Sequence, residues 1–488
     1  MNDVPPSSRP KATASDVISA YGTQKEGFRG NGESRRGDLL GLVLAWLAIL
    51  IGIVLWVWTP GGDPSEDALE AEVPSGLLLS QQDEMVGKLA FGMQDLSSML
   101  PPMQQAEMLS TGGVAQRTSY AILEAELIGI DQAREELESI LAESGDDPVT
   151  LMLLPAVTAV FDALDAGEAA PVASTELLEE RLGWFGRLAS AMGRPDEMSA
   201  IKASAKTGMM TFLAGIGLMF IAGLLGFVGL IVLLVFGFTG RIASKVFPVT
   251  RHGVYAETFA IWLLLMLLLQ MLASFLVDLL SVEGMGLLAS IMAFFLSLAV
   301  LAWPVFRGIE WRTVRKDIGL ERPRLLDIPT GVASWAMALP FLFLGAFMTV
   351  VLTLLVQFLT NETPQPEHPA QQAAMTASGW GLFQLFLLAS VAAPVVEEIM
   401  FRGVLFSHLR GAMRRWAVPL GIVLSAIISS VIFAAIHPQG FVFIPPLAGL
   451  GIGFCIAREW RGSVVPAMVA HGVSNALVMS LNVFLFGG

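Results

Sequence analysis

Nine apolar stretches, each 17 residues or longer, run through this chain with almost no charge inside them. They cover residues 39–58, 209–238, 256–277, 284–305, 329–358, 379–397, 416–436, 441–457 and 463–485. A helix needs about 20 apolar residues to cross the hydrocarbon core of a bilayer. Because 54% of all residues are hydrophobic and only 15% are charged, the sequence predicts an all-α polytopic membrane protein with about nine transmembrane helices.

The polar segments between these stretches predict the domain organisation. We expect a disordered cytoplasmic tail at 1–38, a transmembrane anchor at 39–58, an acidic helical domain at 59–206, transmembrane helices two to five within 207–360, a polar loop at 361–378 and a membrane core at 379–488. The segment Val57-Trp58-Thr59-Pro60 offers no small-residue cleavage site, so we expect the first stretch to remain as an anchor.

Residues 60–206 differ from the rest of the chain in charge. They hold 26 acidic and 8 basic residues, a net charge of −18, whereas the whole chain has −14 and the remainder therefore +4. Helical signals dominate this region, among them Asp147-Pro148 as N-cap and first helical residue. The acidity fits either a solvated helical surface or a docking surface for a basic partner.

The basic residues predict the orientation in the membrane. Outside 60–206, all 21 lysines and arginines fall on one side of an alternating nine-span arrangement. Because short cytoplasmic loops carry an excess of Lys and Arg, we expect a cytoplasmic N-terminus, with residues 60–206 and the C-terminus on the other side.

Two consecutive glutamates, Glu397 and Glu398, interrupt one of the most apolar parts of the chain. An ionised side chain in a bilayer costs about 2.5–3.5 kcal/mol on insertion scales, so such residues are usually functional or tightly paired. Arg402 follows Glu398 by four residues, which allows an ion pair on one helix face. Glu397 points about 100° away around the helix, which makes it a candidate general base.

Two histidines in the following stretches are candidate partners of these glutamates. Phe433 and His437 are four residues apart and precede Pro438, and His471 and Asn475 are four apart in the last stretch. A carboxylate, two imidazoles and an amide donor can activate a water and stabilise an oxyanion. Each element alone also has a structural interpretation, as an ion pair or a bridge between helices. Together they favour a catalytic centre, because they are nearly all the strongly polar side chains in these stretches.

These polar residues form three ordered motifs. They are Glu397-Glu398-x-x-x-Arg402-Gly403, Phe433-x-x-x-His437 and His471-x-x-x-Asn475. The motifs resemble those of the CPBP family, the CAAX protease and bacteriocin-processing (Abi-type) intramembrane proteases, and the resemblance covers about 379–485. It implies a catalytic membrane core, and it implies location in a bacterial inner membrane as a multi-pass protein.

The resemblance also implies a role for each residue. Glu397 is the catalytic base and acts with His437 on a water, and His471 and Asn475 stabilise the oxyanion. The supporting residues are Glu398, Arg402 and Phe433. The acidic domain has no counterpart in the minimal family core.

Three functions remain open from the sequence. The first is a glutamic-type endopeptidase that hydrolyses a peptide bond of a membrane-associated or exported protein. The second is a zinc-dependent metalloprotease using Glu397, His437 and His471, although the chain has no His-Glu-x-x-His motif. The third is a non-catalytic scaffold or immunity protein. We expect no cofactor, no metal and no nucleic acid, and a protein or peptide substrate reached in the lipid bilayer.

The position of the motifs along the apolar stretches predicts which face of the membrane the site opens to. Measured from the basic loops, Glu397, His437, His471 and Asn475 lie from the middle of the membrane outwards. The sequence therefore favours a site that opens on the outer side, beneath the acidic domain, with Pro394 bending the sixth helix towards His437. This differs from the CAAX proteases of the family, which process substrates on the cytosolic side.

Overall fold

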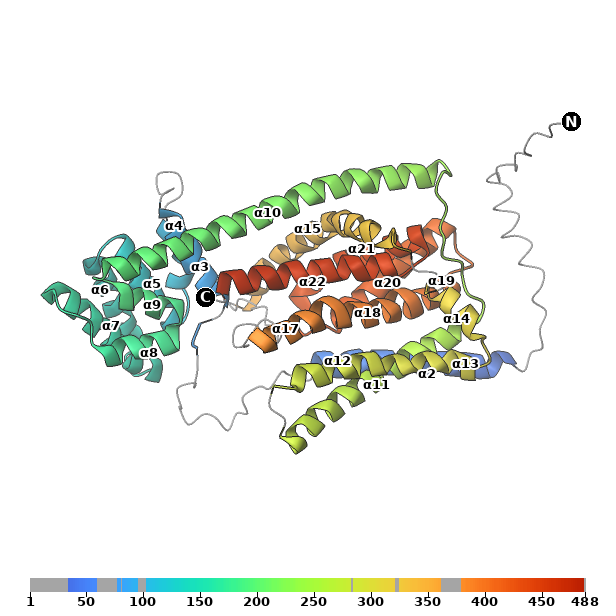
Figure 1. Cartoon of the computed structure of the whole chain (residues 1–488), viewed down its shortest axis with the longest axis horizontal. Coiled ribbons are helices and arrows are strands. Elements are labelled where there is room, and N and C mark those ends of the chain that lie inside the picture. Colours follow the sequence, from blue (N-terminus) through green and yellow to red (C-terminus); the bar gives the residue numbers. More distant parts are fainter. Residues whose placement is uncertain are drawn as a thin grey trace, which may run out of the picture. The chain divides into compact units, whose positions relative to one another are not determined.

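The computed structural model describes residues 34–58, 77–79, 81–94, 102–281, 284–320, 324–360 and 379–486. Throughout these ranges all regular elements are helices, and none of them is a strand (Figure 1). The predicted all-α class is therefore confirmed. The predicted loop 361–378 and all but the end of the predicted tail 1–38 lie outside the described residues.

The chain divides into two compact units. The first comprises Met1–Thr59, Ile221–Ala370 and Ala377–Ala476, and the second comprises Pro60–Phe220, Gln371–Thr376 and Leu477–Gly488. The apolar helices are α2 (Ser34–Trp58), α10 (Pro195–Phe238), α11 (His252–Leu280), α12 (Gly286–Ser297) with η3 (Leu298–Ala302) and α13 (Trp303–Phe306), α15 (Asp327–Thr360), the helical segment Gly379–Ala412, α20 (Val418–Ala435), α21 (Ile444–Arg461) and α22 (Val465–Phe486).

Eight helices in the described ranges are long and apolar enough to cross a membrane. Seven coincide with predicted spans, and the other two predicted spans contain the shorter apolar segments Leu39–Val54 and Val465–Leu481. The eighth is α7 (Pro148–Ala166), which the sequence places in the acidic domain. The chain is a polytopic membrane protein, as predicted.

Two predicted boundaries fall inside continuous helices. The predicted domain end at 206 lies within α10, a helix of 44 residues that starts at Pro195 because proline and two acidic residues suit a first helical turn. The sixth span, predicted to end at Glu397, continues to Ala412. A count of consecutive apolar residues ends at the glutamates. In the folded helix Glu398 pairs with Arg402, and the helix continues.

Small residues allow α15 and α21 to pack closely. A Cβ on Gly449 would lie 2.3 Å from the carbonyl oxygen of Phe341, and one on Gly453 would lie 2.3 Å from the Cβ of Ala338. Gly449 and Gly453 are four residues apart and so share one helix face. Side chains larger than hydrogen at these positions would push the helices apart, as in other close membrane-helix contacts.

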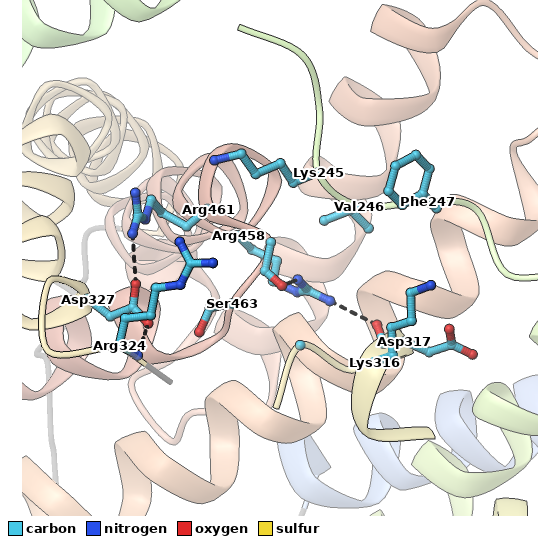
Figure 2. A pocket seen from close by; sticks show the side chains of 12 residues that line it. Lys245, Val246, Phe247, Lys316, Asp317, Arg324, Asp327, Arg458, Arg461 and Ser463 are labelled. Carbon is cyan, nitrogen blue, oxygen red and sulfur yellow. Dashed lines mark hydrogen bonds and ion pairs between the residues drawn. The ribbon is translucent and has the colours of Figure 1, made fainter. Parts of the chain in front are cut away.

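One end of the first unit collects basic side chains. It includes the segment that follows α10, the helix α14 (Trp311–Asp317), the start of α15 and the link between α21 and α22 (Figure 1). A cavity of about 500 Å³ lies among these segments (Figure 2). By the positive-inside rule this end of the bundle is the candidate cytoplasmic end.

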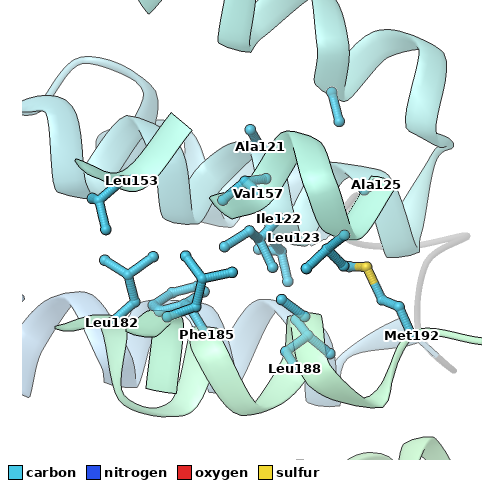
Figure 3. Packing of buried hydrophobic residues seen from close by; sticks show 14 of the residues in the cluster. Ala121, Ile122, Leu123, Ala125, Leu153, Val157, Leu182, Phe185, Leu188 and Met192 are labelled. Atoms are coloured by element: carbon cyan, nitrogen blue, oxygen red, sulfur yellow. The ribbon is translucent and has the colours of Figure 1, made fainter. Parts of the chain in front are cut away.

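The second unit contains short helices around an apolar core. They are α3 (Gln81–Gly92), α4 (Pro102–Ser110), α5 (Val114–Leu127), α6 (Ile130–Ser144), α7, α8 (Val172–Leu182), α9 (Trp184–Ala191) and the beginning of α10. Ile122, Val157, Phe185 and Leu188 are fully buried and pack together (Figure 3). Asp147 caps α7 through a 3.0 Å contact from the Val149 N–H, as the sequence predicts.

The packing of α7 explains its high hydropathy without a membrane. Its residues Leu153, Val157 and Phe161 belong to this apolar core. On its other face, Asp162 and Asp165 each lie 2.8 Å from Arg134 of α6. A helix with an apolar stripe on a protein core and paired charges on the other side is typical of a water-exposed helical domain.

The helix directions generate a test of the predicted orientation. Gln439 follows the C-terminal end of α20, the end away from Arg415, and Cys455 is the only cysteine and is buried. We expect Gln439→Cys in a Cys455→Ala background to react with a membrane-impermeant thiol reagent in intact spheroplasts. A matched Arg415→Cys variant should react only after lysis. The reverse pattern would place the N-terminus outside.

Candidate active site

The two glutamates lie in a helix with two wide turns. The segment Gly379–Ala412 consists of α17 (Gly379–Leu387), the π-helical η4 (Leu388–Ala392), α18 (Ala393–Glu398), the π-helical η5 (Ile399–Leu405) and α19 (Phe406–Ala412). Pro394 lacks an N–H, and its ring clashes with the carbonyl four residues earlier, which gives a reason for the first wide turn. π-Turns within α-helices are rare and often occur at functional sites. The change in helix type thus lies directly before Pro394, the residue at which the sequence predicts a bend.

Glu398 contacts a residue of its own helix and a residue of α22. Its side chain is fully buried, and its Oε1 accepts a hydrogen bond from Arg402 Nη1 at 2.8 Å. The same oxygen lies 2.9 Å from Nδ1 of His471 on α22. The ion pair predicted from the four-residue spacing is present, and His471 joins it from a helix 73 residues further along the chain.

Glu397 faces the other nitrogen of the same imidazole. Its Oε2 lies 3.9 Å from Nε2 of His471, which is longer than a direct hydrogen bond. The Glu397 side chain is 13% exposed, whereas that of Glu398 is 0% exposed. The more accessible carboxylate is thus the one that the sequence singles out as the candidate base.

The ring of Phe433 connects His437 to the glutamates and His471. Its Nδ1 lies 2.7 Å from the carbonyl oxygen of Phe433, and its ring centroid is 4.6 Å from the Phe433 ring. Because a carbonyl only accepts hydrogen bonds, Nδ1 carries the proton in the neutral imidazole and Nε2 is the basic nitrogen. Phe433 also contacts the ring of His471, with centroids 5.6 Å apart. The rings of both histidines therefore contact the ring of Phe433.

Asn475 makes a contact that the motif does not predict. Its carboxamide nitrogen donates to the carbonyl oxygen of Ala389 at 2.8 Å. Ala389 lies in the first π-helical turn, so the contact ties α22 to the helix that carries Glu397. A carboxamide has two N–H groups, and this contact uses one of them.

Three further residues shape the site, and the sequence analysis did not identify them. Phe454 stacks on His471 at a centroid distance of 5.6 Å. A Cβ on Gly451 would lie 2.9 Å from Arg402 Nη2, so glycine makes room for the guanidinium. Arg458 donates to the Arg402 carbonyl oxygen at 3.2 Å. The signal in the sequence that could have identified them is the four-residue spacing of Phe454 and Arg458 in α21, which places both on one helix face.

The arginine inside the bundle is stabilised by aromatic rings as well as by Glu398. Its guanidinium carbon lies 4.3 Å from the centroid of Phe433 and 5.2 Å from that of Phe454. A cation over an aromatic face gains about 2 kcal/mol when both are removed from water. The Arg402 side chain thereby links the glutamate helix to both aromatic residues that contact His471.

Comparison with known proteins finds relatives of the segment that carries these residues. Residues 379–477 match the protein-family model described as Type II CAAX prenyl endopeptidase Rce1-like. The chain is 26% identical over 163 residues to the "Membrane-embedded CAAX protease MroQ" of Staphylococcus aureus (strain USA300), an alignment that covers 33% of this chain and 61% of that protein. No solved structure matches the chain. The predicted resemblance to CPBP-family proteases is confirmed for this segment.

The double contact of Glu398 predicts a structural effect of its removal. Glu398→Gln leaves the buried Arg402 without a carboxylate, and breaking a buried pair costs about 3–5 kcal/mol. We expect a clearly lower thermal unfolding temperature for the purified protein in detergent. Glu397→Gln should unfold close to the wild type. Equal unfolding temperatures for the Glu398→Gln variant and the wild type would show that the pair does not stabilise the bundle.

Proposed function

We propose that this chain is an intramembrane endopeptidase that hydrolyses a peptide bond of a membrane-associated or exported protein. The observation that carries the proposal is the convergence of Glu397, Glu398 and His471 inside an apolar bundle, with His437 joined to them by Phe433. Such polar groups are expensive within a membrane, and here they occur together within the segment that matches a protease family. The match to part of one curated protease supports the same class.

In this mechanism Glu397 takes a proton from the attacking water. Water adds to the carbonyl carbon of the scissile amide, and the carbonyl oxygen becomes an oxyanion. The proton on Glu397 then passes to the amide nitrogen as the carbon–nitrogen bond breaks. The distance of 3.9 Å between Glu397 Oε2 and His471 Nε2 is compatible with one water in contact with both atoms.

Glu398 has a positioning role in this proposal. It accepts a hydrogen bond from the Nδ1–H of His471, so that Nε2 faces the candidate base. His437 is oriented in the same manner by the Phe433 carbonyl, and it is the proposed partner of Glu397 in activating the water. The two imidazoles are thus fixed by different acceptors.

His471 and Asn475 remain the proposed oxyanion-stabilising pair, a role in which His471 carries a proton on Nε2 as well as on Nδ1 and donates from Nε2. They lie four residues apart on α22 and project from the same face. The Ala389 contact holds the Asn475 carboxamide with one N–H, and the second N–H is the proposed donor to the oxyanion. Fixed donors in a dry site are worth about 2.7–4 kcal/mol each in transition-state stabilisation.

The substrate follows from the location of the site. A peptide bond must enter a bundle of apolar helices, which favours a substrate anchored in or attached to the membrane. The acidic region 60–206 is a proposed docking surface for a basic segment of such a substrate, because its net charge is −18. We propose that the site opens to the same side as this domain.

The zinc alternative requires three ligands around one ion. Within the described ranges, no group of three or more His, Cys, Asp or Glu side chains is arranged to hold a metal. Glu397 and His471 approach each other within 3.9 Å, and Glu398 occupies Nδ1 of the same histidine. Chelation, described below, separates the two chemistries.

Replacing Glu397 by Gln keeps its shape and removes the proton acceptor. We expect turnover to fall at least 10²–10⁴-fold, as is typical when a general base is lost. New protein N-termini, which mark cleavage sites, would be compared in membranes of cells that express the wild type, Glu397→Gln or the control Glu310→Gln. Cleavage rates would then be measured on a peptide that contains one of these cleavage sites. Termini made by the wild type and control alone support the proposal. Undiminished cleavage by Glu397→Gln overturns it, and no new termini with any of them would favour the non-catalytic alternative.

A second prediction concerns metal ions. Dialysis of the purified chain against a strong chelator should leave turnover unchanged, and elemental analysis should find far less than one zinc per chain. Loss of turnover that returns when zinc is added would support the metalloprotease alternative instead.

A further inference from the structure

The cavity at the basic end of the first unit is separate from the candidate active site. It is bordered by the segment after α10, the end of α14, the start of α15 and the link from α21 to α22. Its volume is about 500 Å³, and neither the glutamates nor the two histidines of the candidate site line it (Figure 2). Its function is therefore a question independent of peptide-bond hydrolysis.

The lining of this cavity is strongly positive. Five basic side chains and two carboxylates line it, a net formal charge of +3. The basic residues are Lys245, Lys316, Arg324, Arg458 and Arg461. Such an excess around one hollow favours an anionic ligand.

Both carboxylates are already engaged by groups of the protein. Asp327 accepts from Arg461 Nη2 at 3.0 Å and from the backbone N–H of Arg324 at 2.9 Å. Asp317 accepts from the hydroxyl of Tyr255 at 2.7 Å. Figure 2 shows the Asp317 carboxylate turned away from Arg324 and Arg461. The two acidic groups therefore leave much of the positive charge in the cavity uncompensated.

Several of the cations lack a carboxylate partner. In the part of the chain that the structure describes, no ion pair joins Lys245, Lys316 or Arg324 to an acidic side chain. Arg458 is buried and donates to three backbone carbonyls, those of Arg402, Gly462 and Asp317. Lys245, Arg324 and Arg461 line the cavity from three separate segments, and Figure 2 shows Arg461 joined to Asp327. Their positive charges repel one another, and a bound anion would reduce that repulsion.

The surroundings indicate what kind of anion fits. The cavity lies where α15 begins and α21 ends, and the ends of helices long enough to cross a membrane are expected at the depth of the lipid headgroups. The ring of Phe247 on its border is 65% exposed, which suits contact with an acyl chain. Basic pockets between transmembrane helices on the cytoplasmic side are typical headgroup sites. We propose that this cavity binds the phosphate group of an anionic phospholipid, with Lys245, Arg324 and Arg461 as its donors.

The site is connected to the helix that carries the glutamates. Arg458 contacts the carbonyl oxygen of Arg402 at 3.2 Å on one side and lines the cavity on the other. Gly319 leaves room for it, because a Cβ there would lie 2.6 Å from the guanidinium carbon and its backbone has a φ of +80°. A phosphate bound beside Arg458 would therefore stabilise the position of the second π-helical turn.

The test uses the full chain, purified without lipid, and native mass spectrometry with added phosphatidylglycerol or phosphatidylcholine. We expect the wild type to bind phosphatidylglycerol in preference to phosphatidylcholine. The variant Lys245→Gln/Arg324→Gln should bind phosphatidylglycerol roughly 30-fold more weakly, about fivefold for each basic side chain removed. The matched control Arg312→Gln/Arg415→Gln removes two exposed charges that do not line the cavity and should bind like the wild type.

A variant that keeps the positive charge shows whether a loss of binding comes from the lost charge or from misfolding. Lys245→Arg should retain binding, and thermal unfolding of each variant is measured alongside. Equal phosphatidylglycerol affinity for the wild type and the Lys245→Gln/Arg324→Gln variant would overturn the proposal, as would equal affinity for both lipids. The unfolding temperature is also measured with each ligand. If millimolar inorganic phosphate raised the unfolding temperature as much as phosphatidylglycerol does, the proposal would be overturned in favour of a soluble anion. None of these measurements depends on peptidase activity.

Discussion

A single buried oxygen, Oε1 of Glu398, holds two side chains from two different helices. Arg402 donates to it from the same helix and His471 from α22. A carboxylate with no exposure is tolerable only when such partners compensate its charge, because desolvation costs several kcal/mol per ion. The position of His471 relative to Glu397, and hence the proposed chemistry, depends on this interaction.

Aromatic and small residues extend that interaction through the bundle. Arg402 lies over Phe433, which contacts both histidines, and Gly451 leaves space for the guanidinium. The close packing of α15 on α21 through Gly449 then closes the other side of α21. Burial of Arg402 therefore depends on residues of its own helix, α20 and α21, although its carboxylate partner is only four residues away in the same helix.

The sequence predicted what depends on local spacing. The ion pair of Glu398 with Arg402 follows from a separation of four residues, and the Asp147 cap follows from a proline at the first helical position. The contact of His471 with Glu398 joins residues 73 apart, so no local pattern could reveal it. The same holds for Asn475, which has a backbone carbonyl as partner, and backbone acceptors leave no mark on the sequence. The length of the sixth helix was underestimated because hydropathy treats paired and unpaired charges alike.

The two π-helical turns fix the direction of the glutamates through the number of residues in the helix rather than through their identity. A π-turn accommodates one residue more than an α-turn, and each residue of an α-helix rotates the side chains that follow by about 100°. Loss of one residue within Leu388–Ala392 would tighten the wide turn that precedes Pro394 and displace the backbone carbonyls within it relative to Glu397 and Glu398. The Ala389 carbonyl would then leave the reach of Asn475. This part of the chain should accordingly accept changes of apolar side chain far more readily than a change in length.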